Sequence, residues 1–140
     1  MKMTIFFTLI LSIFVVSACQ TASTETASNV PTGAGQNEIK EISVEQAKNA
    51  VDTKDAQFID VRTIEEYAGG HAVGAKNLPL DKLEADFAEL DKNKPVYVIC
   101  ETGRRSQKGS EILQKAGFKD IYNITGGTSE WKSAGLPTEK

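Results

Sequence analysis

The sequence predicts an α/β fold built on a central parallel sheet with helices on both faces. Short apolar segments alternate with segments that open on helix-capping patterns, and this alternation runs from Glu38 to the end of the chain. Strands that alternate with helices pair in parallel through right-handed crossovers, which place helices over the sheet. No internal repeat is visible, and the folded part has a common size for one domain.

In the first part of this domain, two capping boxes predict helix starts. Ser-x-x-Gln at 43–46 opens a helix that runs to about residue 50, and Thr-x-x-Glu at 63–66 opens a shorter one. The Gly69-Gly70 pair ends the second helix. Between the two helices, the apolar stretch 56–61 predicts a strand.

The middle of the domain predicts an extended segment, a helix and a strand. Residues 74–80 are extended, because Pro79 prevents a helix there. Asp-x-x-Glu at 81–84 predicts a capping box for a helix whose apolar residues continue to Leu90. After a polar loop, the apolar run 96–99 predicts a strand that ends at a cysteine.

The last part predicts a long helix, a strand and a short helix. Ser106 is a good N-cap type, so the long helix is expected to start near it and to end at a cap formed by Gly117 and Phe118. A strand follows at 120–124, and the terminal helix holds Trp131, which we expect in the core.

Residues 1–18 have the pattern of a lipoprotein signal peptide. A lysine near the start precedes an apolar stretch that is shorter than the roughly 20 residues of a spanning helix. The residues Val-Ser-Ala-Cys at 16–19 resemble a bacterial lipobox, in which cleavage precedes an acylated cysteine. We therefore expect lipidation of Cys19, with ordinary cleavage nearby as the alternative.

After Cys19, the segment 19–37 is predicted to be a flexible tether, because it is rich in Ser, Thr, Ala and Gly and cannot build a core. The domain then spans 38–140. Gln20 is not the Asp that retains many lipoproteins at the inner membrane, so we expect export to the periplasmic side of the outer membrane. In a single-membraned host the domain would lie on the cell exterior.

Composition excludes several kinds of partner. The formal net charge is −3, and it becomes one unit more negative without Lys2, so nothing indicates nucleic acid. One histidine and two distant cysteines do not make a zinc site, and no cofactor is expected. The membrane is reached only through the lipid, and the absence of a heptad pattern makes a monomer the default.

Cys100 is the residue with the clearest chemical role. It follows a strand of the sheet, and ligands of such sheets bind beyond the carboxyl ends of the strands. Gly103 lets the loop amides turn inward, and the next helix adds its free N–H groups. With Arg104 and Arg105 alongside, these features favour the thiolate. The alternative is a buried cysteine that acts as a small apolar residue.

These motifs resemble a single-domain rhodanese across residues 38–137, and the exported form is similar to the periplasmic phage-shock rhodaneses. The matching positions are Asp60-Val61-Arg62, Glu66-Tyr67, Gly70-His71, Asn77-x-Pro79, Cys100-x-x-Gly103-x-Arg105-Ser106, and Gly126-Gly127 through Trp131. The resemblance implies a rhodanese-like three-layer fold and sulfurtransferase chemistry.

By this resemblance, Cys100 attacks the outer sulfur of an anionic donor such as thiosulfate and becomes a persulfide. An acceptor, cyanide or a biological thiol, then takes that sulfur. The substrate-binding residues are the loop from Glu101 to Ser106, which includes Thr102 and Gly103, together with Arg105 at the family's motif position. Arg104 occupies a variable position, so its role is inferred from charge alone.

Three charged residues of the motif are expected to be structural. Asp60 at a strand end should cap the next turn, with Arg62 and Glu66 pairing nearby to hold the scaffold under the loop. His71 is expected to be a hydrogen-bonded turn residue rather than a proton shuttle.

Two other functions compete with sulfur transfer. Related phosphatases and arsenate reductases place five residues between the cysteine and the arginine, whereas only four, Glu101 to Arg104, lie between Cys100 and Arg105 here. A non-catalytic rhodanese-like module that binds a partner or senses sulfur compounds is the second alternative. Retention of the cysteine and its loop favours the enzyme.

Overall fold

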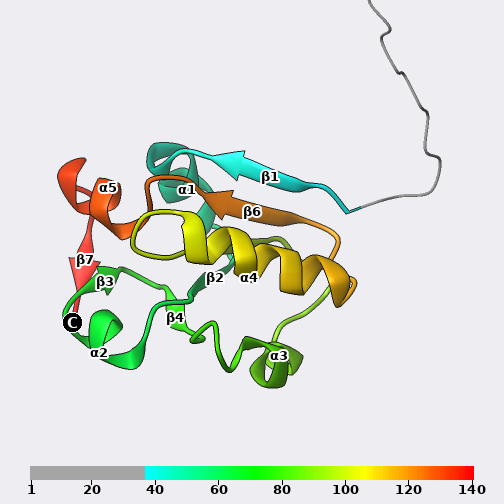
Figure 1. The fold of residues 1–140 in the computed structure, drawn as a ribbon. Coiled ribbons are helices and arrows are strands. Elements are labelled where there is room, and N and C mark those ends of the chain that lie inside the picture. The colour runs from blue at the N-terminus through cyan, green and yellow to red at the C-terminus, as the bar shows by residue number, and fades with distance from the viewer. Residues whose placement is uncertain (1–36) are drawn as a thin grey trace, which may run out of the picture. The chain divides into compact units, whose positions relative to one another are not determined.

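The computed structural model describes residues 37–140. Five parallel strands form the central sheet in the order β1-β6-β5-β2-β4 (Figure 1). Their bounds are Ile39–Ile42 for β1, Gln57–Asp60 for β2, Lys76–Asn77 for β4, Val96–Ile99 for β5 and Ile121–Ile124 for β6. A separate antiparallel pair joins β3, His71–Ala72, to β7, Thr138–Glu139.

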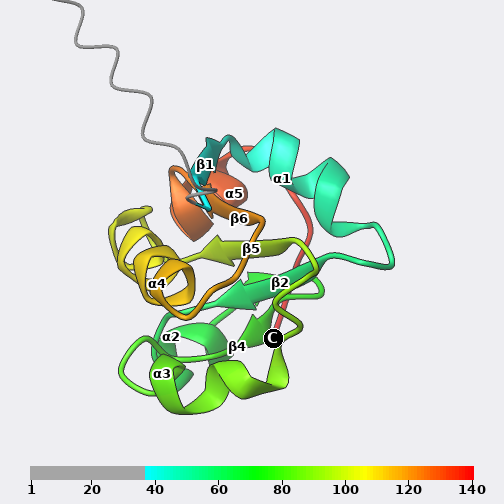
Figure 2. The same cartoon turned by 90° about the vertical axis from the view of Figure 1, so that its right-hand side faces the viewer.

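Helices cover both faces of the sheet, so the predicted α/β fold is confirmed. In Figure 2, α1 lies on one side of the strands, whereas α4 and α3 lie on the other. The helical segments are α1 at Val44–Val51, α2 at Ile64–Ala68, α3 at Leu83–Asp86, the 3-10 turn η1 at Phe87–Glu89, α4 at Arg104–Lys115 and α5 at Gly127–Ser133.

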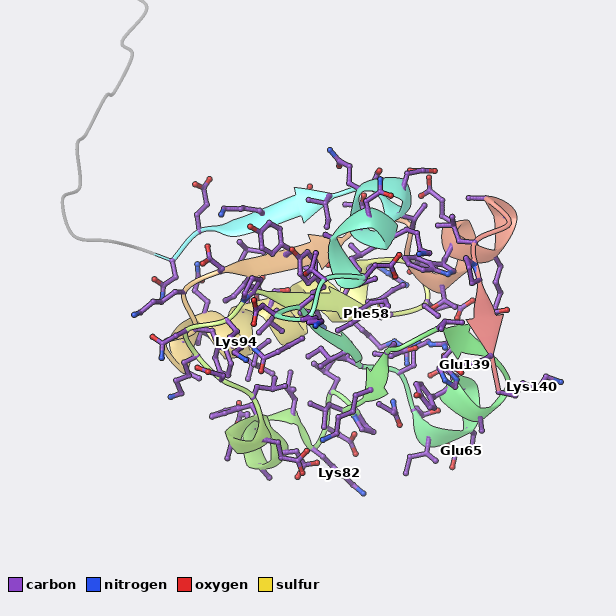
Figure 3. All side chains as sticks on the ribbon, turned by 180° about the vertical axis from the view of Figure 1, so that it is seen from behind. Phe58, Glu65, Lys82, Lys94, Glu139 and Lys140 are labelled. Carbon is purple, nitrogen blue, oxygen red and sulfur yellow. The ribbon has the colours of Figure 1, made fainter. Side chains whose placement is uncertain are left out.

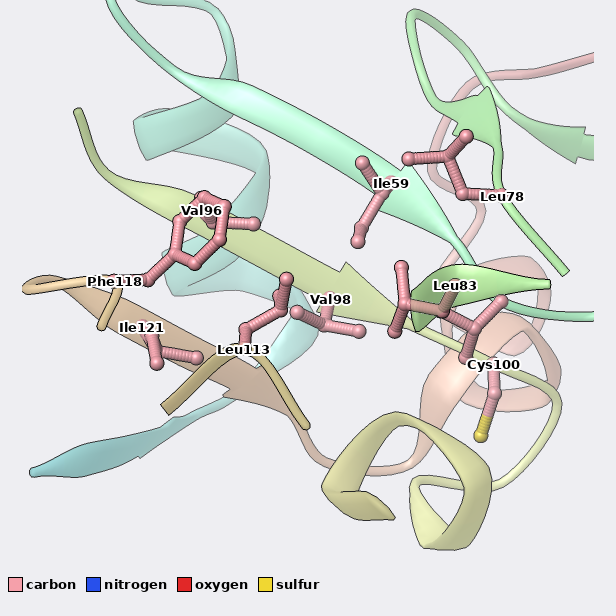
Figure 4. Packing of buried hydrophobic residues seen from close by; sticks show 10 residues of the cluster. Ile59, Leu78, Leu83, Val96, Val98, Cys100, Leu113, Phe118 and Ile121 are labelled. Carbon is pink, nitrogen blue, oxygen red and sulfur yellow. The ribbon is translucent and has the colours of Figure 1, made fainter. Parts of the chain in front are cut away.

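Strand β5 lies at the centre of the sheet, and all of its residues are buried. Val96 and Val98 pack against Leu113 of α4 and against Phe118, in a cluster that extends to Cys100 (Figure 4). Because alternate residues of a strand face opposite sides, this cluster fills one face of the sheet. The catalytic candidate therefore stands at the edge of a packed apolar layer.

The other two residues of β5 fill the second face. Tyr97 and Ile99 belong to a cluster with Val44 of α1 and Trp131 of α5. Phe58 of β2 lies in the same cluster, beneath α1 (Figure 3). Trp131 is 1% exposed, which confirms that it is a core residue.

Local sequence signals account for several of these boundaries. Ser43 and Thr63 both form complete capping boxes, at the starts of α1 and α2. At the end of α4, the Phe118 N–H donates to Leu113 O at 3.1 Å, and Gly117 takes a positive φ of 90°. This is the cap that the Gly-Phe pair predicts.

The predicted capping box at 81–84 is wrong. The N-cap of α3 is Lys82, whose side chain makes no capping hydrogen bond. The amides of Lys82 and Leu83 donate to Pro79 O and Leu80 O at 2.9 and 3.4 Å. Tight turns after the proline thus precede the helix, and they leave Asp81 inside a turn.

Helix α4 starts near Ser106, as predicted, but Ser106 is not its N-cap. The N-cap is Gly103, in the left-handed region with φ 96°, and the helix begins at Arg104. Ser106 lies inside the first turn, where its hydroxyl donates to Gly103 O at 3.0 Å. A glycine can take this backbone conformation without steric cost, so it turns the chain into the helix earlier than a serine cap would.

Three strands of the sheet end together at its carboxyl edge. Asp60 of β2 pairs with Ile99 of β5, and Val98 of β5 pairs with Asn123 of β6. The loops that leave these strands, including the one after Ile99, therefore meet above this edge.

The expected signal peptide at 1–18, Cys19 and nearly all of the expected tether lie outside the described residues. In the described part, 37–140, no helix has both the length and the apolar character that crossing a membrane requires.

Candidate active site

Cys100 is the first residue after β5, and its side chain is 1% exposed. In Figure 4 its sulfur points away from the apolar cluster, toward the turn that opens α4. The Gly103 N–H donates to Cys100 Sγ at 3.2 Å. The thiol therefore occupies the centre of the loop that the sequence predicts as an anion cradle.

Two opposing influences set the pKa of Cys100. Burial raises it, but the hydroxyl and amide of Ser106 and the amides of Thr102 and Gly103 lower it by more, so the net shift is downward. Donors that face a sulfur stabilise its charged form. The thiolate is consequently favoured at a lower pH than for an ordinary cysteine, as expected for a reactive thiol.

The Ser106 hydroxyl can serve the sulfur only by turning. It has a single proton, which donates to Gly103 O when the site is at rest. An ionised sulfur is a stronger acceptor than a neutral carbonyl, because hydrogen bonds to charged groups are stronger. Ser106 is 0% exposed, so no water competes for that proton.

The start of α5 holds the loop from behind. The Thr128 N–H and hydroxyl both donate to Cys100 O, at 2.7 and 3.0 Å, and the Ser129 N–H donates to Glu101 O at 3.1 Å. The loop carbonyls are thereby directed toward α5. A Cβ on Gly127 would lie 2.4 Å from Cys100 O, so only glycine allows this approach.

The Glu101 side chain is held by two partners. Arg62 Nη1 donates to its carboxylate at 3.1 Å, and the Ser129 hydroxyl donates at 2.8 Å. The Ser129 hydrogen bond, with help from Arg62 and against the effect of burial, lowers the pKa of Glu101. Both contacts keep the carboxylate in a fixed position beside the loop.

Arg62 itself belongs to a buried ion pair. Its guanidinium donates to both carboxylate oxygens of Asp60, and its Nη2 also donates to Gly70 O at 3.0 Å. Asp60 Oδ1 accepts the Arg62 backbone N–H at 3.0 Å, so the expected cap on the turn after β2 is present. Breaking such a pair costs about 3–5 kcal/mol, which makes this turn a rigid support for the loop.

Arg105 is engaged by Glu66 in a bidentate pair. Both Nη atoms donate to the carboxylate oxygens at 2.6 Å, and about a third of each side chain is exposed. Arg105, opposed by desolvation, lowers the pKa of Glu66 to about 2. The arginine thus lies beside the loop with its charge balanced by a carboxylate.

Arg104 faces a different side of α4. It is exposed, and among residues 37–140 it forms no ion pair. With Lys108, Thr102, Glu101 and Arg105 it lines a hollow of about 660 Å³. Glu101, Thr102 and both arginines therefore share one hollow beside Cys100, while the donors that act on the sulfur itself come from Thr102, Gly103 and Ser106.

The remaining motif residues are structural in their contacts. His71 Nδ1 lies 3.0 Å from Tyr67 O, and the two rings stack at 3.6 Å. His71 belongs to β3 and makes no contact with Cys100 among its hydrogen bonds. No group of three potential metal-ligating side chains occurs within residues 37–140.

Sequence reasoning missed two contributors to the site, Thr128 and Ser129, which hold the loop carbonyls and Glu101. Asn77, noted in the sequence only as a motif position, donates from Nδ2 to Asp60 O and Arg62 O at 3.0 and 2.9 Å. The glycine pair just before Thr128 was the available signal, because paired glycines often mark a close backbone approach.

Comparisons with known proteins place this site in a family. The family described as "Rhodanese-like domain" matches residues 43–134. YrkF of Bacillus subtilis is 37% identical over 110 residues, which make up 78% of this chain but only 55% of YrkF. The thiosulfate sulfurtransferase GlpE of Shewanella oneidensis is 34% identical over 95 residues, which are 68% of this chain and 94% of GlpE.

Solved structures agree with the observed fold. The crystal structure of a rhodanese-like domain protein from Staphylococcus aureus superposes with a TM-score of 0.64 at 35% identity. The match covers 73% of this chain and 100% of the S. aureus chain. With its parallel sheet, its cysteine loop and these relatives, the chain belongs to the rhodanese-like domain family.

Proposed function

We propose that this protein is a thiosulfate-type sulfurtransferase, which moves sulfane sulfur through a persulfide on Cys100 to a thiophilic acceptor. The observation that carries the proposal is the position of Cys100 Sγ among loop amides, with the Gly103 N–H at 3.2 Å. These donors lower the pKa of the Cys100 thiol. The thiolate can therefore form without a histidine as general base. The GlpE relative is named as a thiosulfate sulfurtransferase.

In the first half-reaction, the Cys100 thiolate attacks the outer sulfur of thiosulfate. A new bond forms between Cys100 Sγ and that sulfur, the sulfur–sulfur bond of thiosulfate breaks, and sulfite leaves with the electron pair. The product persulfide carries a terminal anionic sulfur. The amides of Thr102, Gly103 and Ser106 stabilise this charge, as they stabilise the thiolate.

A module that only binds a partner has no use for this electrostatic arrangement. A cysteine that only fills space would be served by apolar surroundings, which raise the pKa of a thiol. Here polar donors from the loop and the first turn of α4 reverse that effect. The arrangement supports a thiolate that reacts, in an enzyme or in a sulfur sensor. The similarity to GlpE, which is named as a thiosulfate sulfurtransferase, favours the enzyme.

The sequence supports export as a further part of the proposal. We propose that Cys19 is acylated and that the lipid, followed by the tether, holds the domain on the outside of the cytoplasmic membrane. The periplasmic side of the outer membrane is the proposed location in a double-membraned host, and the cell exterior in a single-membraned one. Two acyl chains or more give stable anchoring, whereas one chain binds only marginally.

The central test is the intact mass of the purified protein before and after thiosulfate, and again after cyanide. We expect a gain of one sulfur atom on Cys100, followed by its loss as thiocyanate. The variant Cys100→Ser should gain no sulfur and retain its melting temperature, because a hydroxyl is a similar size but a far weaker nucleophile. Sulfur transfer by that variant would disprove the mechanism.

Ser106→Ala tests the pH dependence of the thiol. The Ser106 hydroxyl lowers the pKa of Cys100, so its removal should raise that pKa and leave less thiolate at neutral pH. The rate of alkylation by iodoacetamide, measured against pH, should show its midpoint moved upward, with the plateau at high pH retained. Ser110→Ala, on the same helix, is the matched control and should not move the midpoint. An unshifted midpoint in Ser106→Ala would remove the assigned role of its hydroxyl.

Glu66→Gln tests whether Arg105 binds the donor. Glutamine keeps an oxygen for the Thr63 N–H, which Glu66 accepts at 3.0 Å, but it removes the charge that balances Arg105. The KM for thiosulfate should fall by up to about fivefold, the range of a partly exposed ion pair, with kcat little changed. The matched control is Glu65→Gln, which removes an exposed charge without such a pair. An unchanged or higher KM in Glu66→Gln would count against donor binding by Arg105.

Cys19→Ala tests the anchor. Expressed in bacteria with its own leader, the protein should fractionate with membranes and be released by detergent. Cys19→Ala should lose this membrane association, because no acyl chain can be attached, whereas Cys100→Ser should keep it. Recovery of the unaltered protein in the soluble fraction would refute lipid anchoring.

A further inference from the structure

One acidic side chain lines the hollow of about 660 Å³ beside Cys100, together with three cationic ones. The lining residues come from the Cys100 loop and from α4, and they are Glu101, Thr102, Arg104, Arg105 and Lys108. We call this hollow the hollow over the loop. Glu101 directly follows the reactive cysteine, in a loop whose amides stabilise negative charge on sulfur. A carboxylate at this position opposes any anion that the loop attracts.

Both oxygens of the Glu101 carboxylate are held by the protein. Oε2 accepts from Arg62 Nη1 at 3.1 Å, and Oε1 accepts from the Ser129 hydroxyl at 2.8 Å. The Glu101 side chain is nevertheless 39% exposed, so these contacts do not remove it from the hollow. A fixed and partly exposed negative charge therefore stands at the wall of the hollow.

The cation that contacts Glu101 is shared with a second carboxylate. Arg62 donates to Asp60 through Nε and Nη2, and only its Nη1 reaches Glu101. Asp60 and Arg62 are both buried, so they balance each other inside the protein. Lys132 of α5 also lowers the pKa of Glu101, but it forms no ion pair with Glu101 among residues 37–140. The charge of Glu101 is therefore only partly compensated.

The contacts of Glu101 do not require its charge. A glutamine at this position could accept from Arg62 and donate to the Ser129 hydroxyl, so an uncharged side chain would hold the same place. What the carboxylate adds is a negative charge at the wall of the hollow. The interaction energy of that charge with a ligand grows with each charge that the ligand carries. The carboxylate therefore acts on the net charge of the molecule that enters the hollow.

We infer that Glu101 is a specificity-determining residue of the sulfur-transfer site, whose carboxylate weakens the reaction of a sulfur donor for each negative charge that the donor carries. The three cations of the hollow attract anions, and Glu101 limits this attraction. A singly charged donor thereby gains on a doubly charged one, compared with a hollow that contains the cations alone. The inference rests on the proposed function, since it concerns the donor of that reaction.

Two donors that differ by one charge test the inference in the reaction itself, on the whole protein with cyanide as acceptor. Thiosulfate is a dianion, and methanethiosulfonate is a monoanion in which a methyl group replaces one oxygen. With either donor, Cys100 Sγ bonds to the outer sulfur, the sulfur–sulfur bond of the donor breaks, and sulfite or methanesulfinate leaves with the electron pair. In Glu101→Gln, kcat/KM for thiosulfate relative to methanethiosulfonate should rise by about two- to fivefold, the range of an exposed charge pair.

Alkylation of Cys100 gives a second readout that does not depend on sulfur transfer. Iodoacetamide is neutral and iodoacetate is anionic, and with both reagents Cys100 Sγ bonds to a methylene carbon as iodide leaves. The rate is followed by the mass of the peptide that contains Cys100. Glu101→Gln should raise the rate of iodoacetate relative to iodoacetamide by the same factor, because these reagents also differ by one charge. At about 1 M salt the difference between the two proteins should largely vanish, since exposed charges are screened there.

Two further variants separate charge from structure. Glu101→Asp keeps the charge and should leave both ratios close to those of the unaltered protein. Glu84→Gln removes an exposed carboxylate of α3 that does not line the hollow and forms no ion pair among residues 37–140, so neither ratio should change. A merely structural role of Glu101 would lower the melting temperature of Glu101→Gln and slow both members of each pair equally.

The outcomes separate this inference from the proposed function. If the persulfide forms but either ratio is unchanged in Glu101→Gln, the inference is overturned and the proposed function stands. If neither donor gives a persulfide while the alkylation ratio rises, the proposed function is overturned although Glu101 still acts on anions. Should Glu101→Gln fail to fold, Glu101→Ser also lacks the charge, and unchanged ratios in that variant would refute the inference.

Discussion

The site depends on two backbone carbonyls that point away from it. Thr128 and Ser129 at the start of α5 donate to Cys100 O and Glu101 O. A peptide unit whose carbonyl is fixed on one side presents its N–H on the other, because the unit is planar. The Thr102 N–H shares a peptide unit with Glu101 O, and the Gly103 N–H belongs to the next unit. Both amides act on Cys100 Sγ. The contact from α5 thus favours the orientation in which the loop amides face the sulfur.

Around this loop, buried charge is paired and exposed charge is left for ligands. Arg62 is 2% exposed and is compensated by Asp60 and Glu101, as a buried cation must be. Arg105, at partial exposure, is balanced by Glu66. Of the charged residues that line the hollow over the loop, Arg104 and Lys108 are the two without an ion pair among residues 37–140. The arginines beneath and beside the loop therefore have their charges balanced by carboxylates. The uncompensated positive charge at the opening of the hollow comes from the exposed side chains of Arg104 and Lys108.

The sequence predicted the elements whose signals are local. The capping boxes at Ser43 and Thr63 and the Gly-Phe cap after α4 depend on neighbours a few residues away, and each formed as expected. Strand β5 was predicted because its four residues are apolar on both faces. The position of Cys100 at the end of that strand followed from the topology alone.

The features that the sequence did not predict depend on distant contacts. The edge strand β1, and β3 with its partner β7, are short or polar, and they are strands only because a neighbour pairs with them. Helix α4 starts before Ser106 because Gly103 takes a left-handed conformation and serves as the N-cap. The preference of serine for N-cap positions does not reveal this. The pairing of Arg105 with Glu66 joins residues that are 39 positions apart. The sequence marked both as motif residues without placing them in contact.

The adjacent arginines acquire separate roles from helix geometry. Consecutive residues of an α-helix point about 100° apart, so Arg104 and Arg105 point in different directions although both line the hollow over the loop. Arg105 also lines a hollow with Val61 and Leu80 and pairs with Glu66, whereas Arg104 also lines a hollow with Asn123 and Thr125. The two arginines therefore stand on two sides of the start of α4. The charge of Arg105 is balanced by Glu66, whereas Arg104 has no ion pair within residues 37–140, so Arg104 is the one of the two that adds uncompensated positive charge there.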